Sequence, residues 1–112
     1  MRRRRRQHLN EIDHGLAELW LSAPRTHFVD LRDAESFACH RIQGARSVVH
    51  NNLDTFLANT PKTHDIILYC YNGNVSRYAM AYFRQQGFQY VYSLIGGFEM
   101  WRKRFPNYTV TN

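Results

Sequence analysis

The run from Ile66 to Tyr69, which leads directly into Cys70, constrains the fold of this chain more than any other segment. Its apolar residues are continuous rather than alternating, which is typical of a strand covered on both faces inside a parallel sheet. A short polar loop with one glycine follows, and a helical pattern begins at Ser76. The segment therefore predicts an α/β fold with a thiol at the carboxyl end of a central strand, facing a helix N-terminus.

The rest of the chain alternates between strand and helix patterns. Further strands are predicted over residues 27–31, 46–49 and 90–94, and helices are predicted to begin near residues 10, 34, 52, 76 and 98. The first helix, with Asn10 as its N-cap and an end before Pro24, should carry one apolar stripe formed by Ile12, Leu16, Leu19 and Trp20, and Gly96-Gly97 should turn the chain into the last helix. In the helix from Ser76 to Gln86 we expect Ala79, Tyr82 and Phe83 to face inward, with Gly87 ending it. Strands and helices alternating at this density predict one mostly parallel sheet with helices on both faces.

The length of 112 residues fits a single domain, which we place over residues 8–112. Five of the fifteen Lys and Arg residues are Arg2 to Arg6, so the formal charge of +6 falls to +1 without them. Such a run is either a tail for nucleic acid or a membrane surface, or a frayed and solvated terminus. We expect the second, a disordered basic tail over residues 1–7, because the remaining basic residues are scattered and no nucleic-acid motif is present.

Composition also bears on location and on metals. The longest apolar run is far shorter than a membrane span, and the polar residues 7–11 follow the arginines where a signal peptide needs an apolar region. With only two cysteines, Cys39 and Cys70, we expect a reduced, cytoplasmic protein without disulfides. The six histidines lie singly, so we expect neither a metal site nor a cofactor.

Cys70 is the candidate nucleophile. A free thiol has a pKa of about 8.5, and only the thiolate is nucleophilic. A helix N-terminus offers unpaired N–H donors and partial positive charge, both of which lower that pKa. The loop over residues 71–75 contains no proline, and Gly73 permits the positive φ that turns successive amides toward one centre. We therefore expect a cradle of amides that holds an anion above the sulfur.

The loop carries no carboxylate and no general base. The chemistry should then be one in which the thiolate already exists and the leaving group departs as an anion. Sulfur transfer meets that description, and so does phosphoryl or arsenate chemistry if an arginine neutralises the oxyanion. Cys39 lies in a short amphipathic helix beside Phe37, where we expect it to be buried and structural.

Three segments, in order, resemble the rhodanese-domain family over about residues 8 to 106. The loop Cys70-Tyr71-Asn72-Gly73-Asn74-Val75-Ser76 is closest to that of bacterial single-domain thiosulfate sulfurtransferases of the GlpE type. The N-terminal and C-terminal signatures are matched by Phe28-Val29-Asp30-Leu31-Arg32-Asp33, Glu35-Ser36-Phe37, Ile42-Gln43-Gly44-Ala45, Gly87-Phe88-Gln89-Tyr90-Val91-Tyr92 and Leu94-Ile95-Gly96-Gly97-Phe98-Glu99-Met100-Trp101.

The resemblance implies that Cys70 takes the outer sulfur of thiosulfate, releases sulfite and holds the sulfur as a persulfide. A thiophilic acceptor (cyanide, a small thiol or a protein cysteine) would then remove it. The loop residues that would bind substrate and persulfide are Tyr71, Asn72, Gly73, Asn74, Val75 and Ser76. The resemblance assigns Asp30, Arg32 and Trp101 to structural support.

The chain departs from the family pattern near its candidate cations. Many rhodaneses carry Gly-His before the isoleucine that matches Ile42, whereas this chain has His40-Arg41. Arg41 either stays in solvent or leans toward the rim of the site. Many active loops also hold an arginine near the position of Val75, whereas the nearest one here is Arg77, which either attracts thiosulfate or is merely solvated.

Three other functions share this fold. A Cdc25-like phosphatase or arsenate reductase uses Cys-x5-Arg, but Ser76 stands where that arginine belongs and Arg77 is one residue late. A non-catalytic rhodanese module commonly lacks the cysteine, which is present here. A sulfur-relay carrier that delivers the persulfide to a protein partner needs the same loop, so the sequence leaves it open, together with the oligomeric state.

Overall fold

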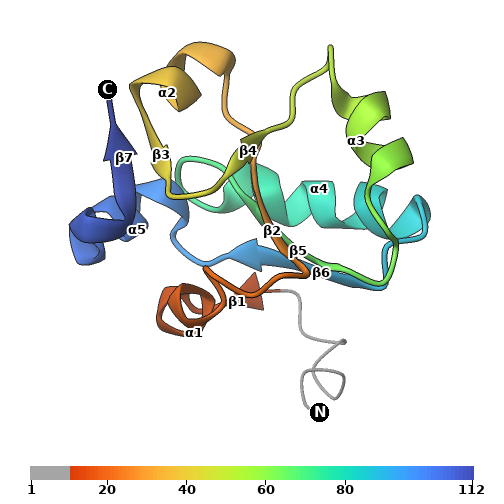
Figure 1. Cartoon of the computed structure of the whole chain (residues 1–112), viewed down its shortest axis with the longest axis horizontal. Coiled ribbons are helices and arrows are strands. Elements are labelled where there is room, and N and C mark those ends of the chain that lie inside the picture. Colours follow the sequence, from red (N-terminus) through yellow and green to blue (C-terminus); the bar gives the residue numbers. More distant parts are fainter. Residues whose placement is uncertain (1–10) are drawn as a thin grey trace.

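The computed structural model describes residues 11–112, and the predicted basic tail over residues 1–7 lies outside them. The chain alternates between strands and helices (Figure 1). The strands are β1 (Glu11–Ile12), β2 (Thr26–Asp30), β3 (His40–Ile42), β4 (Arg46–Ser47), β5 (Asp65–Tyr69), β6 (Tyr90–Leu94) and β7 (Thr109–Thr111). The helices are α1 (His14–Leu19), α2 (Ala34–Cys39), α3 (Leu53–Asn59), α4 (Asn74–Gln85) and α5 (Gly97–Arg104), followed by a 3₁₀ turn at Pro106–Tyr108.

A parallel five-stranded sheet forms the centre of the molecule, in the order β1-β6-β5-β2-β4. The central strand is β5, and all five of its residues are buried. The predicted mostly parallel α/β sheet is therefore confirmed. Because the strands run the same way, their carboxyl ends share one edge, where Asp30 of β2 is the register partner of Tyr69 of β5. Cys70 follows at that edge.

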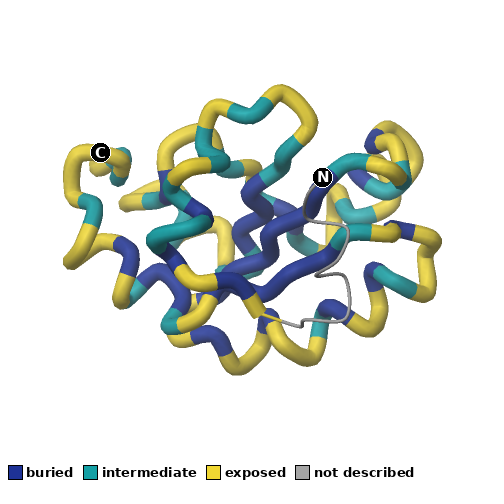
Figure 2. The backbone as a smooth tube through the Cα atoms, turned by 90° about the horizontal axis from the view of Figure 1, so that it is seen from below, coloured by how far each residue is buried: buried dark blue, intermediate teal, exposed yellow. Residues whose placement is uncertain are grey.

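Each face of the sheet is covered by its own pair of helices. One hydrophobic cluster joins α1 and α5 to the sheet through residues such as Ala17, Phe98 and Trp101. The other joins α3 and α4 through Phe56, Met80 and Phe83. The tube in Figure 2 shows the result, with buried strands in the middle and exposed backbone in the surrounding helices and loops. Burial on both faces explains why β5 is apolar throughout instead of alternating.

The predicted first helix is wrong at both ends. Glu11 and Ile12 extend the sheet, with Ile12 buried and paired to Leu94, and the helix begins only after Asp13. Asp13 is its N-cap, because the side chain accepts a hydrogen bond from the Gly15 amide. Because Ile12 lies in a strand, it shares no helical face with Leu16 and Leu19. The buried residues of the helix are His14 and Ala17, and Leu19, predicted to lie on the apolar stripe, is exposed. The predicted cap at Asn10 lies outside the described residues.

The helix after Cys70 begins two residues earlier than predicted, at Asn74. Its buried residues are Ser76, Met80 and Phe83, whereas Tyr82, predicted to face inward, is exposed. The predicted ending is confirmed: Gly87 has φ +100°, and the Phe88 amide donates to the Phe83 carbonyl.

A second sheet was not predicted. Strands β3 and β7 pair antiparallel, with Arg41 opposite Val110, although they lie about seventy residues apart in the sequence. Both are only three residues long, which is too short for a periodic pattern. Within the described residues, no helix is long and apolar enough to cross a membrane.

Candidate active site

The loop after β5 encloses the sulfur of Cys70, and this residue is only 5% exposed. The Gly73 amide lies 3.2 Å from Sγ and the Ser76 amide 3.4 Å from it. Gly73 has φ +95°, so the left-handed turn that aims these amides inward needs glycine. The structure therefore brings Cys70 and the start of α4 together as the sequence predicted, with backbone donors that point at one atom.

Helix α5 holds the same loop from outside. The Phe98 amide donates to the Cys70 carbonyl and the Glu99 amide to the Tyr71 carbonyl, each at 2.9 Å. Gly97 precedes them with φ +59°, and a Cβ there would lie 2.6 Å from both carbonyl oxygens. With the carbonyls bound to α5, the following amides face the sulfur. The sequence predicted only a turn at Gly97 and not its contact with the loop; the one available signal was the pair of adjacent glycines, Gly96 and Gly97.

Two serines extend the contacts of the thiol into the core. The Ser76 hydroxyl lies 3.5 Å from Sγ and 2.6 Å from the hydroxyl of Ser93 on β6. Both serines are fully buried. Ser93 was not identified from the sequence, and its only signal was a small polar residue in an otherwise buried strand.

The pKa of Cys70 is set by opposing effects. Burial raises the pKa of the thiol, whereas hydrogen bonds from the Ser76 hydroxyl and from the amides of Ser76, Gly73 and Asn72 lower it. The hydrogen bonds prevail, and the pKa lies below its ordinary value. All of the donors in these hydrogen bonds are neutral groups, so the thiolate is favoured by hydrogen bonding and not by a nearby positive charge.

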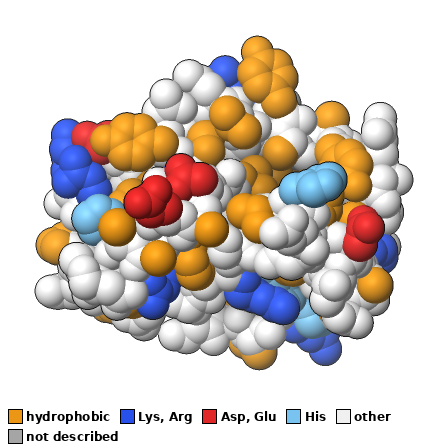
Figure 3. All heavy atoms as spheres, turned by 90° about the horizontal axis from the view of Figure 1, so that it is seen from above, with side chains coloured by type: hydrophobic (Ala, Val, Ile, Leu, Met, Phe, Trp, Pro, Cys, Tyr) orange, Lys and Arg blue, Asp and Glu red, His pale blue; other side chains and the backbone are white. Residues whose placement is uncertain are grey.

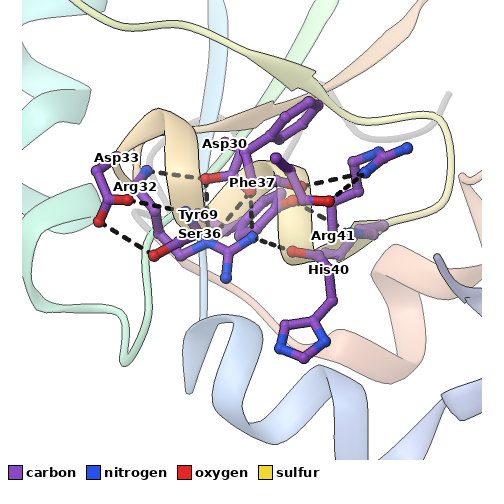
Figure 4. Close-up of polar contacts among 10 residues, drawn as sticks. Asp30, Arg32, Asp33, Ser36, Phe37, His40, Arg41 and Tyr69 are labelled. Atoms are coloured by element: carbon purple, nitrogen blue, oxygen red, sulfur yellow. Dashed lines mark hydrogen bonds and ion pairs between the residues drawn. The ribbon is translucent and has the colours of Figure 1, made fainter. Parts of the chain in front are cut away.

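Asp30 and Arg32 form a buried ion pair beside the site (Figure 4). Arg32 Nη2 lies 2.7 Å from Asp30 Oδ2, and the same nitrogen donates to the His40 carbonyl. The guanidinium also lies 4.2 Å from the centre of the Phe98 ring, which belongs to α5. This pair therefore connects the end of β2 to β3 and to the helix that holds the loop.

Tyr69 and Trp101 complete this support. The Tyr69 hydroxyl accepts a hydrogen bond from the Ile42 amide, and burial followed by the charge of Asp30 raises the pKa of Tyr69. Trp101 is fully buried, and its indole N–H donates to the Tyr108 carbonyl at 3.3 Å. Tyr69 thus connects β5 to β3, and Trp101 connects α5 to the 3₁₀ turn that follows it.

The two candidate cations lie apart from the sulfur. Arg41 donates to the Phe37 and Ala38 carbonyls at the end of α2, so its guanidinium caps that helix. Arg77 contacts Asn74 and lies 3.9 Å from Glu11 of β1. The loop side chains of Tyr71 and Val75 are both exposed at the surface around the site.

Two cavities flank the loop. The first, of about 660 Å³, lies between α2 and α5 and includes Tyr71 in its lining; we call it the α2–α5 cavity. The second, of about 430 Å³, is largely apolar and includes Val75 and Leu53. Figure 3 shows hydrophobic side chains gathered between acidic side chains and a histidine on the face that carries α2 and the start of α3.

Cys39 corrects the sequence interpretation. It was expected to be buried, but it is exposed and lines the α2–α5 cavity. Helix α2 has no buried residue, and none of its residues belongs to either hydrophobic cluster on the faces of the sheet. An amphipathic pattern over six residues did not show whether the helix would pack against the sheet. Among the described residues, no cluster of three His, Cys, Asp or Glu side chains is placed to hold a metal.

The sequence of the chain is similar to those of known proteins. The model of the rhodanese-like domain family matches residues 14–104. Thiosulfate sulfurtransferase GlpE of Pseudomonas aeruginosa is 46% identical over 78 residues, which cover 70% of this chain and 71% of that protein. The GlpE protein of Ectopseudomonas mendocina is also 46% identical, over 81 residues that cover 72% and 74% of the two chains.

Solved structures show the same fold. The BH2092 protein of Bacillus halodurans superposes with a TM-score of 0.78 at 34% identity, covering 92% of this chain and 78% of its own. A thiosulfate sulfurtransferase from Pseudomonas aeruginosa superposes with a TM-score of 0.76 at 26% identity, covering 85% of this chain and 18% of its own. The matched family region includes the whole loop from Cys70 to Ser76.

Proposed function

The chain belongs to the rhodanese-like domain family, and from this premise we propose that it is a thiosulfate sulfurtransferase that carries sulfur on Cys70. The curated relatives with 46% identity are thiosulfate sulfurtransferases. The observation that carries the proposal is the convergence of the Gly73 amide, the Ser76 amide and the Ser76 hydroxyl on one sulfur. Such donors stabilise a thiolate, and the amides of the surrounding loop would stabilise the charge on the outer sulfur of a persulfide.

The reaction has two balanced steps. The Cys70 thiolate attacks the outer sulfur of thiosulfate, a new S–S bond forms, and the old S–S bond breaks so that sulfite leaves with its electron pair. The enzyme then holds a persulfide anion. An acceptor attacks the outer sulfur, the bond to Sγ breaks, and the thiolate is restored. Cyanide would leave as thiocyanate, and a thiol would leave as a persulfide. The amides of the loop would bind the anion in both steps.

The geometry argues against phosphoryl chemistry. A phosphatase loop needs a guanidinium over the oxyanion. At the position of that arginine this chain has Ser76, which is buried and whose hydroxyl is hydrogen-bonded to Cys70 Sγ and to the Ser93 hydroxyl. Arg77, the next residue, contacts Asn74 and Glu11 instead. Delivery of sulfur to a protein partner would use the same persulfide, so it differs only in the second step. We place the reaction in a reducing cytoplasm, where a free thiolate persists.

Mass spectrometry of the intact protein tests the proposal directly. Thiosulfate should add the mass of about one sulfur atom, and a reductant should remove it. Cys70→Ser should abolish both this addition and thiocyanate formation, because the only sulfur inside the loop is lost. Cys39→Ser is the matched control and should retain both. Full turnover by Cys70→Ser would overturn the assignment, and hydrolysis of a phenyl phosphate ester would favour phosphatase chemistry.

A further inference from the structure

The α2–α5 cavity carries opposite charges on walls that come from different elements. Asp33 and Glu35 lie at the start of α2, whereas Arg102 lies in the last turn of α5. Among the described residues, no ion pair joins the two walls. The volume of about 660 Å³ is within the range of sites that bind small molecules. The cavity is therefore complementary to a ligand with both charges.

The cavity also borders the reactive loop. Tyr71, the neighbour of Cys70, lines it, and so does Phe98, whose amide binds the Cys70 carbonyl. The Tyr71 phenol is hydrogen-bonded to Glu99, and Glu99 in turn binds Arg102 at 3.0 Å. These bonds fix the aromatic wall and the cationic wall relative to each other. A ligand in the cavity would thus lie beside the loop that would hold the transferable sulfur.

Arg32 adds a second cation. Its bonds to Asp30 and His40 use Nε and Nη2, so Nη1 is the guanidinium nitrogen that can serve a ligand. The other cavity next to the loop differs in kind, because aliphatic side chains such as Leu31, Val49 and Leu53 dominate its lining. It shares Arg32 and Asp33 with the α2–α5 cavity but lacks Glu35 and Arg102, so a small molecule with two charges would find fewer ionic partners there when it sheds water.

We infer that the α2–α5 cavity binds the sulfur acceptor, and that this acceptor is a small thiol carrying both a carboxylate and an ammonium group. This inference rests on the proposed function. The carboxylate would lie toward Arg102 and Arg32, and the ammonium toward Glu35 and Asp33. The acceptor thiolate would attack the outer sulfur of the Cys70 persulfide, form a persulfide of its own, and return the electron pair to Sγ.

Alkylation of Cys39 tests binding without any sulfur transfer, because this exposed thiol lines the cavity. In Cys70→Ser protein, Cys39 is the only thiol, and its alkylation by iodoacetamide is followed by mass. S-methylcysteine, which has both charges but no free thiol, should slow the reaction in a saturable manner. Acetate and methylamine, each with one charge, should protect up to about fivefold more weakly, as expected for loss of one solvent-exposed ion pair.

Charge variants then test the two walls. Glu35→Gln and Arg102→Gln, in the same Cys70→Ser background, should each weaken protection by S-methylcysteine about fivefold. Asp54→Asn and Arg25→Gln make the same charge changes at exposed positions outside the cavity lining and should keep the protection. Absence of saturable protection, or equal effects of cavity and control variants, would overturn the inference.

The kinetics of the intact enzyme give a second readout. For each thiol, kcat/KM of a variant is divided by that of the wild type, so the acidity of the thiol cancels. Glu35→Gln should lower this ratio about fivefold for cysteamine and cysteine, which carry an ammonium group, but not for thioglycolate. Arg102→Gln should lower it about fivefold for thioglycolate and cysteine, which carry a carboxylate, but not for cysteamine. Protection of Cys39 without sulfur loading of Cys70 would contradict the proposed function alone. Sulfur loading without protection would contradict the cavity assignment alone.

Discussion

At the scale of single residues, the site works by hydrogen bonds to one sulfur. A thiolate loses hydration when it is buried, which alone would raise the pKa of Cys70. The bonds from Ser76 and the loop amides more than compensate. If the Ser76 hydroxyl donates to the thiolate, the Ser93 hydroxyl must donate to Ser76, because each hydroxyl has one proton. Ser93 is thus a positioning residue that never touches the sulfur.

This arrangement predicts graded effects on the thiol. Ser76→Ala should raise the pKa of Cys70 by about one to two units, since a hydrogen bond to a charged group contributes roughly 1.5–3 kcal/mol. Ser93→Ala should raise it by less, because it only reorients Ser76. The rate of Cys70 alkylation against pH, measured in a Cys39→Ser background, reports the pKa. Ser22→Ala, in an exposed turn, should change nothing. An unchanged pKa in Ser76→Ala would mean that the amides alone determine it.

At the scale of elements, the loop after β5 depends on the start of α5. The amides that begin α5 would otherwise lack partners, and the carbonyls of Cys70 and Tyr71 satisfy two of them. Gly97 makes this approach possible, because its backbone is left-handed and a Cβ would meet both carbonyl oxygens. The C-terminal segment therefore shapes a loop that lies more than twenty residues before it in the sequence.

Gly97→Ala should consequently disturb the loop as well as the fold. We expect the free energy of unfolding to fall by about 2–4 kcal/mol, from backbone strain and overpacking together. Sulfur loading from thiosulfate should fall more than about tenfold, because a loss of 1.4 kcal/mol in loop geometry already costs that factor. Denaturant unfolding and intact mass after thiosulfate treatment measure the two effects.

Gly44→Ala is the matched control for this prediction. Gly44 also has a positive φ, of +80°, but a Cβ there would meet nothing within 4 Å. Only the backbone strain of about 1–2 kcal/mol should remain, and sulfur loading should be retained. Equal loss of loading in both variants would show that general destabilisation, and not the contact of Gly97 with the loop, is responsible.

At the scale of the whole molecule, the two ends of the parallel sheet carry different titrating groups. Cys70 lies at the carboxyl end of β5, whereas His27 and His64 meet near the amino ends of β2 and β5, with Nε2 and Nδ1 3.0 Å apart. Burial, followed by the charges of His64 and Arg46, lowers the pKa of His27 below its ordinary value of 6.5. Acid should therefore act on stability at one end and on reactivity at the other.

The sign follows from proton binding. Below about pH 6.5 the unfolded chain takes up a proton at His27 that the folded chain resists, so acid favours unfolding until the folded pKa is reached. We expect the thermal midpoint to be lower at pH 5.5 than at pH 7.5, by on the order of a few degrees. His27→Gln should reduce this difference, whereas His50→Gln, at an exposed loop position, should retain it. A pH dependence that is the same in both variants would contradict the role of the pair.

The sequence by itself determined the central strand, the parallel sheet and the position of Cys70. Those features depend on local patterns: a continuous apolar run, a polar loop without proline, and a helix that follows at once. Three residues expected to face inward are exposed instead: Cys39, Leu19 and Tyr82. Each expectation came from residue spacing along one helix, and spacing alone does not show which side of a helix packs against the sheet.

Only the tertiary structure decided what surrounds the sulfur. Ser93, Gly97 and the cavity between α2 and α5 come from elements that are distant in sequence and are brought together by the order of the strands. The pairing of β3 with β7 is another contact between segments that are distant in the sequence. Contacts of this kind depend on which faces and edges meet, and no local pattern encodes them. The sequence thus identified the candidate thiol, and the fold supplied the donors around it and the cavity beside its loop.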